Sequence, residues 1–338
     1  MHQKRQSQAE GIFDADAAQA EPDGVPDATE SDAADMSDDA RDGAAASSSS
    51  SPSSRHGLLR RIAGVPGAIG AWLEPYRGLN PKYFTGMVAV LLSVIVMCLP
   101  SAYAVESPGP TADVLGKTGG KQVIAVTGAK THQDKGKLLL VTVNASGVPG
   151  YPVTNAQTLY AWIDPHQTVM PQEAVVPVGQ TAEEYKKESS KEMSSSQDTA
   201  TAAALAYAKK LGVDTDGVKV TMHVDDIGGP SAGMMYALGL IDKLTPDNET
   251  GGKTIAGTGT MSKNGKVGAI GGIRLKMLGA KRDGATWFLA PESNCSEVVG
   301  HVPSGLRDVK VATLDEAYRA LVAIGKGEGE TLAHCTAK

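Results

Sequence analysis

The chain has 338 residues with a formal net charge of −6, and 41% of its residues are hydrophobic. This length allows one or two globular domains. The acidity is concentrated in residues 1–54, which contain 12 acidic against 3 basic residues and end in the serine-rich run SSSSSPSS. That segment has too few apolar residues to bury, so we expect a disordered acidic tail. Because the remainder carries a net charge of +3, no broad basic field indicates a nucleic-acid partner.

A basic juxtamembrane segment at 55–82 is followed by an uncharged apolar stretch at 83–105. The stretch is long enough to cross a bilayer once, and its aromatic ends suit a membrane interface. Basic residues exceed acidic ones before it, and charges cancel after it. The positive-inside rule therefore places the N-terminus in the cytoplasm and everything after 105 outside. The motif SAYA resembles a signal-peptidase site and would release the chain after Ala104, but the length of the leader favours an uncleaved transmembrane helix.

The chain contains three cysteines. Cys98 lies in the apolar stretch, which leaves Cys295 and Cys335 in the exported part. A disulfide between these two is chemically permitted outside the cytoplasm. The sequence alone leaves two readings open, a Cys295–Cys335 disulfide or two free thiols.

Beyond the anchor the sequence predicts an α+β fold, with an α/β region at 106–216, a core at 217–325 and a tail at 326–338. Thr181 and Glu184 form a capping-box pattern that opens a helix, and this helix should end at Gly212. Asn264 and Gly265 predict a hairpin turn. The expected strands lie at 135–146, 217–224, 286–292 and 308–314, and further helices should begin near Ser231, near Ile273 and at Leu314.

The triplet GKT occurs at 116–118 and at 252–254, and a P-loop would use such a triplet to bind phosphate. A P-loop also needs a glycine five residues before the first residue of the triplet. Those positions are Thr111 and Asp247. We therefore expect no ATP site, and nothing in the sequence indicates a metal ion or another cofactor.

The motif GPSAG, centred on Ser231, matches the G-x-S-x-G nucleophile elbow of α/β-hydrolases, which would make the protein an esterase-like hydrolase. That reading requires a later aspartate followed by a histidine. Asp315 and His334 keep this order, but His334 lies four residues from the C-terminal end of the sequence. His301 has Asp283 as its upstream partner, on an expected charged helix end. The sequence gives this histidine route little support.

Lysine is the alternative base. Lys276 falls early in a predicted helix that follows a glycine pair, and most of its neighbours in sequence are apolar. Loss of hydration lowers the pKa of a lysine, so that a neutral amine can take the proton of a serine hydroxyl. A Ser231–Lys276 dyad would then replace a serine–histidine–aspartate triad. From composition alone, Arg274 and Lys281 are comparable positions.

The combined motifs resemble a known family. The sequence GGPSAG, the lysine of GGIRLK 45 residues after the serine, and AGTGTMSKNGKVGAIGG between them are similar to the proteolytic domain of Lon proteases, over about residues 218–321. The segments ESPGPTADV, YAWIDPHQTVMP, LTPDNETGGKTIAGTGT and ESNC resemble the membrane-anchored, ATP-independent Lon-like proteases of Gram-positive bacteria. The resemblance implies a Lon-type proteolytic fold behind a single transmembrane helix, protein or peptide substrates, no cofactor, and a ring-like homo-oligomer such as a hexamer.

By this resemblance Ser231 matches the nucleophile of an acyl-enzyme mechanism and Lys276 matches its general base. Thr258 matches a threonine that lies beside the lysine and helps to orient it. A helix start at Ser231 would direct backbone N–H groups at the developing oxyanion. The motif residues expected to support the serine are Gly229, Pro230, Ala232 and Gly233.

Two departures from the family pattern affect the expected function. Relatives carry a PDZ domain before the strand that leads to the serine, whereas here Gly212 is followed almost directly by that strand. Many Lon proteins have an acidic residue directly before GPSAG, where this chain has Gly228, with Asp225 and Asp226 slightly upstream. We expect altered substrate selection or lower activity, and a membrane-anchored scaffold without catalysis remains an alternative to an endopeptidase.

Overall fold

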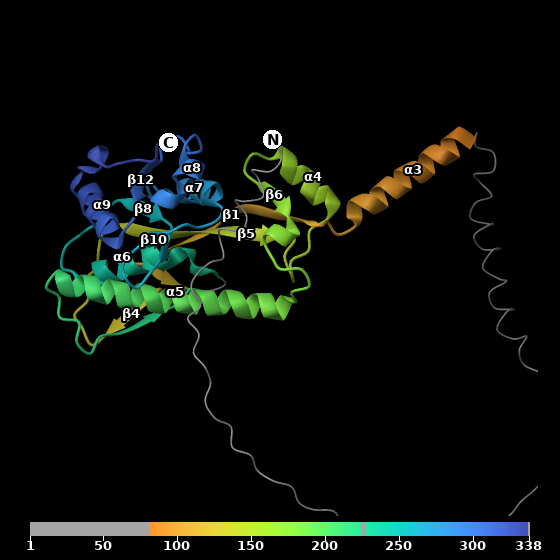
Figure 1. Cartoon of the computed structure of the whole chain (residues 1–338). Coiled ribbons are helices and arrows are strands. Elements are labelled where there is room, and N and C mark those ends of the chain that lie inside the picture. Colours follow the sequence, from red (N-terminus) through yellow and green to blue (C-terminus); the bar gives the residue numbers. More distant parts are fainter. Residues whose placement is uncertain (1–80, 225–227, 337–338) are drawn as a thin grey trace, which may run out of the picture. The chain divides into compact units, whose positions relative to one another are not determined.

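The computed structural model describes residues 81–224 and 228–336 (Figure 1). The expected acidic tail at 1–54 lies outside the described residues, as do most of the basic segment at 55–82 and the pair Asp225 and Asp226.

The apolar stretch forms helix α3, Pro81–Cys98, and none of its residues is buried. By length and composition α3 could cross a membrane. The expected span to residue 105 is wrong at its C-terminal end, because strand β1 begins at Tyr103. Pro100 explains the difference: proline disfavours the helical conformation of the residue before it and has no N–H to donate. Ala104 and Val105 are therefore buried in the sheet rather than in the helix.

The main sheet contains six strands in the order β12-β11-β8-β5-β1-β6 (Figure 1). Its strands are β1 (Tyr103–Asp113), β5 (Lys137–Ser146), β6 (Thr168–Pro171), β8 (Thr254–Gly257), β11 (Trp287–Pro291) and β12 (Arg307–Val311). Strands β5, β8, β11 and β12 run parallel to one another, whereas β1 pairs antiparallel with both β5 and β6. The regions divided at residue 216 in the sequence therefore contribute strands to one sheet.

Three two-stranded pairs accompany the main sheet. They are β2 (Lys117–Thr118) with β3 (Lys121–Gln122), β4 (Ile124–Thr127) with β7 (Lys219–Met222), and β9 (Thr260–Met261) with β10 (Val267–Gly268). The last pair is the hairpin predicted from Asn264-Gly265, and Gly265 has a positive φ of 80°. The strands predicted at 135–146, 217–224, 286–292 and 308–314 are all confirmed.

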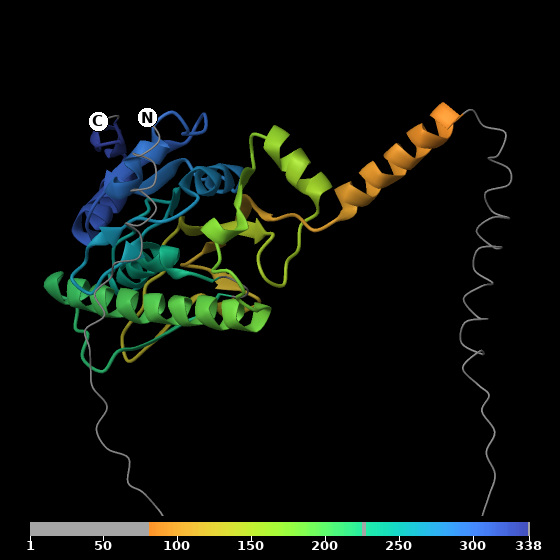
Figure 2. The same ribbon diagram turned by 45° about the vertical axis from the view of Figure 1, so that its right-hand side comes forward.

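Helices cover both faces of the main sheet (Figure 2). Helices α6 (Gly233–Leu244) and α9 (Leu314–Lys326) bury their apolar residues with Leu138 and Leu140 of β5. Helices α7 (Ile273–Arg282) and α8 (Cys295–Val298) pack with Leu139 and Val141 on the opposite face. Because side chains alternate along a strand, the continuous apolar run of β5 serves both layers.

Helix α5, Ala182–Lys210, lies along α6 and completes the layer on that side (Figure 1). The predicted capping box is confirmed: Thr181 and Glu184 exchange side-chain and backbone hydrogen bonds at its N-terminus. The helix ends as expected before Gly212, which has a φ of 88°. The remaining elements are α4 (Asn155–Ile163) and the short 3₁₀ turns η3 (Gln172–Ala174), η4 (Pro230–Ala232), η5 (Glu292–Asn294) and η6 (Gly329–Thr331).

Cys295 and Cys335 form a disulfide, with their Cα atoms 4.9 Å apart. It joins the start of α8 to the C-terminal segment. That segment also binds strand β12, since the Cys335 N–H donates to Asp308 Oδ2 at 2.7 Å. Cys98 is a free, exposed cysteine at the end of α3.

Candidate active site

Ser231 lies in η4, the short turn through which the chain enters α6. The turn begins after Gly229, whose φ of 85° is in the left-handed region that favours glycine. Pro230 occupies the first position of the turn, where its missing N–H costs no helical hydrogen bond. The strand–loop–helix order predicted around the serine is confirmed, with β7 before it and α6 after it.

The segment after β8 holds the backbone of the serine in place. The Ser231 carbonyl accepts hydrogen bonds from the Gly259 N–H at 2.8 Å and from Thr258 Oγ1 at 3.0 Å. The Met234 N–H returns a bond to the Gly259 carbonyl at 3.0 Å. Thr258 is fully buried. Its hydroxyl donates to the serine carbonyl, and its oxygen can still accept a hydrogen bond, so the expected role of this threonine beside Lys276 stays a prediction.

Helix α5 holds the same turn from the other side. Ser196 Oγ donates to the Pro230 carbonyl at 3.0 Å, and the Gly229 N–H approaches the Ser189 carbonyl at 3.4 Å. A Cβ atom at Gly228 would lie 1.8 Å from Ser189 Oγ, so a larger residue there would force the Ser189 hydroxyl to rotate away. The sequence did not indicate Ser189 or Ser196 as parts of the site, because the capping box predicts where α5 starts and not what it contacts.

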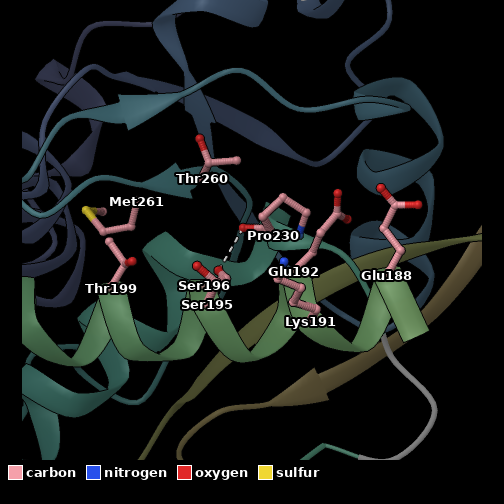
Figure 3. A pocket seen from close by; sticks show the side chains of 9 residues that line it. All are labelled: Glu188, Lys191, Glu192, Ser195, Ser196, Thr199, Pro230, Thr260 and Met261. Carbon is pink, nitrogen blue, oxygen red and sulfur yellow. Dashed lines mark hydrogen bonds between the residues drawn. The ribbon is translucent and has the colours of Figure 1, made fainter. Parts of the chain in front are cut away.

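A cavity of about 380 Å³ lies between α5 and the turn (Figure 3). Pro230, Thr260 and Met261 line one side of it. Six residues of α5 line the other, namely Glu188, Lys191, Glu192, Ser195, Ser196 and Thr199. The cavity therefore begins at the residue next to Ser231, and charged and hydroxyl side chains contribute most of the α5 side.

Lys276 lies on α7, and its backbone N–H donates to the Gly272 carbonyl at 3.0 Å. Gly272 caps the helix with a left-handed φ of 67°. The loop before the helix is fixed by Asn294, which bonds both the N–H and the carbonyl of Ile270, at 2.9 and 2.8 Å. Lys276 is only 3% exposed. It is one of several cationic residues on α7.

The other two candidate cations on α7 are engaged elsewhere. Arg274 donates to the carbonyls of Pro165 and Gln167, and Lys281 donates to the carbonyl of Gly305. Composition did not distinguish Arg274 and Lys281 from Lys276. Burial does, because Lys276 is the buried residue of the three.

Burial lowers the pKa of Lys276 to about 8, and the negative charges of Glu106 and Glu297 oppose this shift. Burial in turn raises the pKa of Glu106, against the attraction of Lys276. Among the described residues, neither Ser231 Oγ nor Lys276 Nζ makes a hydrogen bond to another side chain. Within the described structure the hydroxyl and the amine are therefore not held by another side chain.

In the alternative histidine mechanism, the two candidate aspartates are bound to side chains other than histidine. Asp315 accepts a hydrogen bond from the Tyr207 hydroxyl at 2.9 Å and pairs with Arg319. Asp283 pairs with Arg282 and accepts a bond from Thr111 Oγ1. Neither aspartate orients a histidine in the part of the chain that the structure describes.

Metal-ligating side chains gather at one place in the described residues, where Asp134, Asp242 and Glu249 meet. Asp242 lies near the C-terminal end of α6, whereas Ser231 precedes the N-terminal end of that helix. The serine and the buried lysine therefore have no metal-ligand group beside them in the described structure.

Comparison with known proteins identifies the family of this chain. Residues 153–323 match the Lon protease (S16) C-terminal proteolytic domain, a match that begins well before the core expected from residue 217. The chain is 36% identical over 128 residues to Lon protease 2 of Herpetosiphon aurantiacus, covering 34% of this chain and 16% of that protein. It is 36% identical over 135 residues to Lon protease 1 of Sorangium cellulosum, covering 37% of this chain and 16% of that protein.

The chain thus spans about a sixth of the length of these relatives, and the shared part is the proteolytic domain. That domain covers half of the chain and is the domain of a serine-type peptidase. The chain belongs to the Lon protease (S16) family.

Proposed function

We propose that the protein is an ATP-independent serine endopeptidase that uses Ser231 as nucleophile and Lys276 as general base. The observation that carries this proposal is the burial of Lys276, which brings its pKa to about 8. At that pKa an appreciable fraction of the amine is neutral near physiological pH and can accept a proton. The absence of a glycine five residues before either GKT triplet supports independence from ATP.

In the proposed reaction Lys276 takes the proton of the Ser231 hydroxyl as Oγ attacks the carbonyl carbon of the scissile peptide bond. The oxyanion that forms would be stabilised by the N–H groups of Ser231 and Ala232, because N–H groups in the first turn of a helix have no helical partner. The protonated lysine then gives its proton to the leaving amine. Water hydrolyses the acyl-enzyme with Lys276 again acting as base.

The cavity beside Pro230 is the proposed binding place for a substrate side chain near the scissile bond. It opens next to the proposed nucleophile. Thr258 and Gly259 fix the turn on this side of the cavity, because both donate hydrogen bonds to the Ser231 carbonyl. A Cβ atom at Gly229 would meet nothing within 4 Å, so this side of the turn is open, whereas Gly233 allows the turn to pack closely on Met261. Substrate recruitment would differ from that of PDZ-containing relatives.

We also propose that α3 anchors the protein in the membrane, with the N-terminus in the cytoplasm and the proteolytic domain outside. Helix α4 supports this placement. Asn155 Nδ2 donates to the Val96 carbonyl at the end of α3, and α4 exposes Tyr160, Trp162 and Ile163. Aromatic side chains of this kind are enriched at membrane interfaces. Extracytoplasmic or membrane-associated proteins would then be the substrates, and a ring-like homo-oligomer stays a prediction.

The proposal is tested by adding the full chain, in detergent micelles and without nucleotide, to an unfolded protein substrate across a range of pH. Lys276 must be neutral to act, and its pKa is about 8. We therefore expect kcat/KM to rise about tenfold per pH unit below the pKa and to level off above it. Added ATP should change nothing. A rate that falls as pH rises, or cleavage that requires ATP, would overturn the proposal, and no cleavage at any pH would favour the scaffold alternative.

A further inference from the structure

Three carboxylates meet at the end of α6 that lies away from Ser231. Asp134 belongs to the loop before β5, Asp242 to the last turns of α6, and Glu249 to the loop between α6 and β8. One carboxylate oxygen from each residue lies within 4.8 Å of the others. The fold therefore brings together three acidic side chains from three different segments of the chain.

Two of these side chains are buried and have carboxylate oxygens that accept no hydrogen bond in the described structure. Asp242 is 1% exposed, and neither of its carboxylate oxygens has a hydrogen bond within the described structure. Glu249 is 3% exposed, and its Oε2 likewise has none. Buried polar oxygens are nearly always satisfied by a donor, a water or an ion, because leaving them unpaired is costly. The unpaired oxygens of Asp242 and Glu249 belong to the same cluster.

The remaining oxygens are held by the surrounding loops. The N–H groups of Gly136 and Thr250 donate to Asp134 at 2.8 Å each. The Tyr318 hydroxyl donates to Glu249 Oε1 at 3.3 Å. Hydrogen bonds of this kind orient carboxylates that bind metal ions in proteins. Two members of the cluster are therefore fixed in direction.

Nearby lysines form no ion pair with the cluster in the described residues, although the charge of Lys243 acts on Asp242. Lys243 Nζ donates to the Leu115 carbonyl at 3.1 Å, and Lys253 Nζ donates to the Ile324 carbonyl. No ion pair among the described residues includes Asp242 or Glu249. Burial, followed by the neighbouring carboxylates, raises the pKa of Asp242 to about 9. The cluster therefore has no ion-paired cation among the described residues.

We propose that Asp134, Asp242 and Glu249 bind one hard divalent cation, Ca²⁺ or Mg²⁺. The donor set consists of oxygens alone, which such ions prefer and which does not suit zinc. Two oxygens at about 2.4 Å from a Ca²⁺ ion can be up to about 4.8 Å apart, so the spacing fits one shared ion. Water completes the coordination.

The ion would stabilise the fold and would take no part in peptide-bond hydrolysis. Asp242 lies nine residues after the first residue of α6, which places the cluster about 14 Å along the helix axis from the serine turn. The site joins the loop at Asp134, the end of α6 and the loop at Glu249. It goes beyond the proposed peptidase function, and its test does not use proteolysis.

Terbium luminescence tests the site directly, because Tb³⁺ replaces Ca²⁺ at oxygen sites and is excited by energy transfer from a nearby tyrosine. Tyr318 touches Glu249, whereas the acidic segment 1–54 contains no tyrosine or tryptophan. The full chain, stripped with EDTA in detergent micelles, should give one saturable emission signal that Ca²⁺ or Mg²⁺ displaces. Competition by each ion separately shows which of the two is preferred.

The variant Asp242→Asn, which keeps the side-chain shape, should weaken Tb³⁺ binding about 100-fold. The matched control Asp216→Asn removes an exposed carboxylate outside the cluster and should leave binding unchanged. No saturable emission from the parent chain, or equal affinity in Asp242→Asn, would overturn the proposal.

Thermal melting gives a second readout that remains valid if Asp242→Asn alters folding. A saturating concentration of the preferred ion should raise the melting temperature of the parent by about 5 °C. The same addition should not stabilise Asp242→Asn. If neither Ca²⁺ nor Mg²⁺ shifts the parent, the cluster holds a shared proton instead and the proposal is wrong.

Discussion

Replacing Lys276 by methionine should lower kcat/KM by about 10⁴-fold or more while making the protein more stable. The activity falls because no other amine on α7 can take the proton of Ser231. Stability rises because burial holds the pKa of this lysine at about 8, below its ordinary 10.5. The unfolded chain binds that proton more tightly than the folded chain, so the lysine destabilises the fold below pH 8 and this penalty disappears as pH rises towards 10.5. At pH 7 the gain from Lys276→Met is about 3 kcal/mol in the free energy of unfolding.

Peptide cleavage and thermal melting of the same preparations measure both effects. Lys281→Met is the matched control, since it removes a cation from the same helix whose amine donates to the Gly305 carbonyl. Its activity should stay within about twofold of the parent. Full activity in Lys276→Met would show that another base serves Ser231. Equal losses of activity in Lys276→Met and Lys281→Met would show that activity depends on the total charge of α7 and not on one amine.

Removing the disulfide should produce the largest loss of stability. Cys295 and Cys335 are separated by 40 residues, and closing a loop of that length stabilises a fold by about 4 kcal/mol in the chain-entropy account. The double variant Cys295→Ser with Cys335→Ser should therefore melt about 10 °C below the parent. The C-terminal segment should detach first, because its other anchors include single hydrogen bonds such as Lys310 N–H to the Ala333 carbonyl.

The control for this prediction is Cys98→Ser, which removes the free cysteine of α3 and should not change the melting temperature. Melting with and without a reductant gives an independent measurement. The prediction is wrong if the reductant leaves the melting temperature of the parent unchanged, or if alkylation before reduction labels Cys295 and Cys335.

Local signals predicted most of the fold. The capping box at Thr181 and Glu184, the turn at Asn264-Gly265 and the apolar run of β5 depend on residues close in sequence, and each appears where it was expected. The apolar helix was extended too far in the sequence analysis because hydropathy does not distinguish an exposed apolar helix from a buried strand. Pro100 was the local signal that separates α3 from β1.

The site was predictable to the extent that its residues lie in motifs. GPSAG gave Ser231 and its turn, but long-range contacts determined the rest. Composition could not choose Lys276 over Arg274, since only the packing of α7 on the sheet buries one and exposes the other to loop carbonyls. The bond from Thr258 to the serine carbonyl joins segments 27 residues apart.

The carboxylate cluster was even less predictable from the sequence than the serine site. Asp134 lies more than 100 residues before Asp242 and Glu249, and no metal-binding spacing connects the three. They meet because β5 and β8 are neighbours in the sheet, so that the loops leading into these strands lie together. A sequence search for ligand spacing therefore had no pattern to detect, and we expected no metal from the sequence.

The most direct test of the central claim is to locate the acyl group during turnover. The full chain in detergent micelles is mixed with a peptidyl ester that acylates faster than it deacylates, quenched in acid, digested and examined by mass spectrometry. We expect the acyl group on Ser231 and no adduct or turnover in Ser231→Ala. Turnover that persists in Ser231→Ala, or an acyl group on a different residue, would contradict the assignment of Ser231 as the nucleophile.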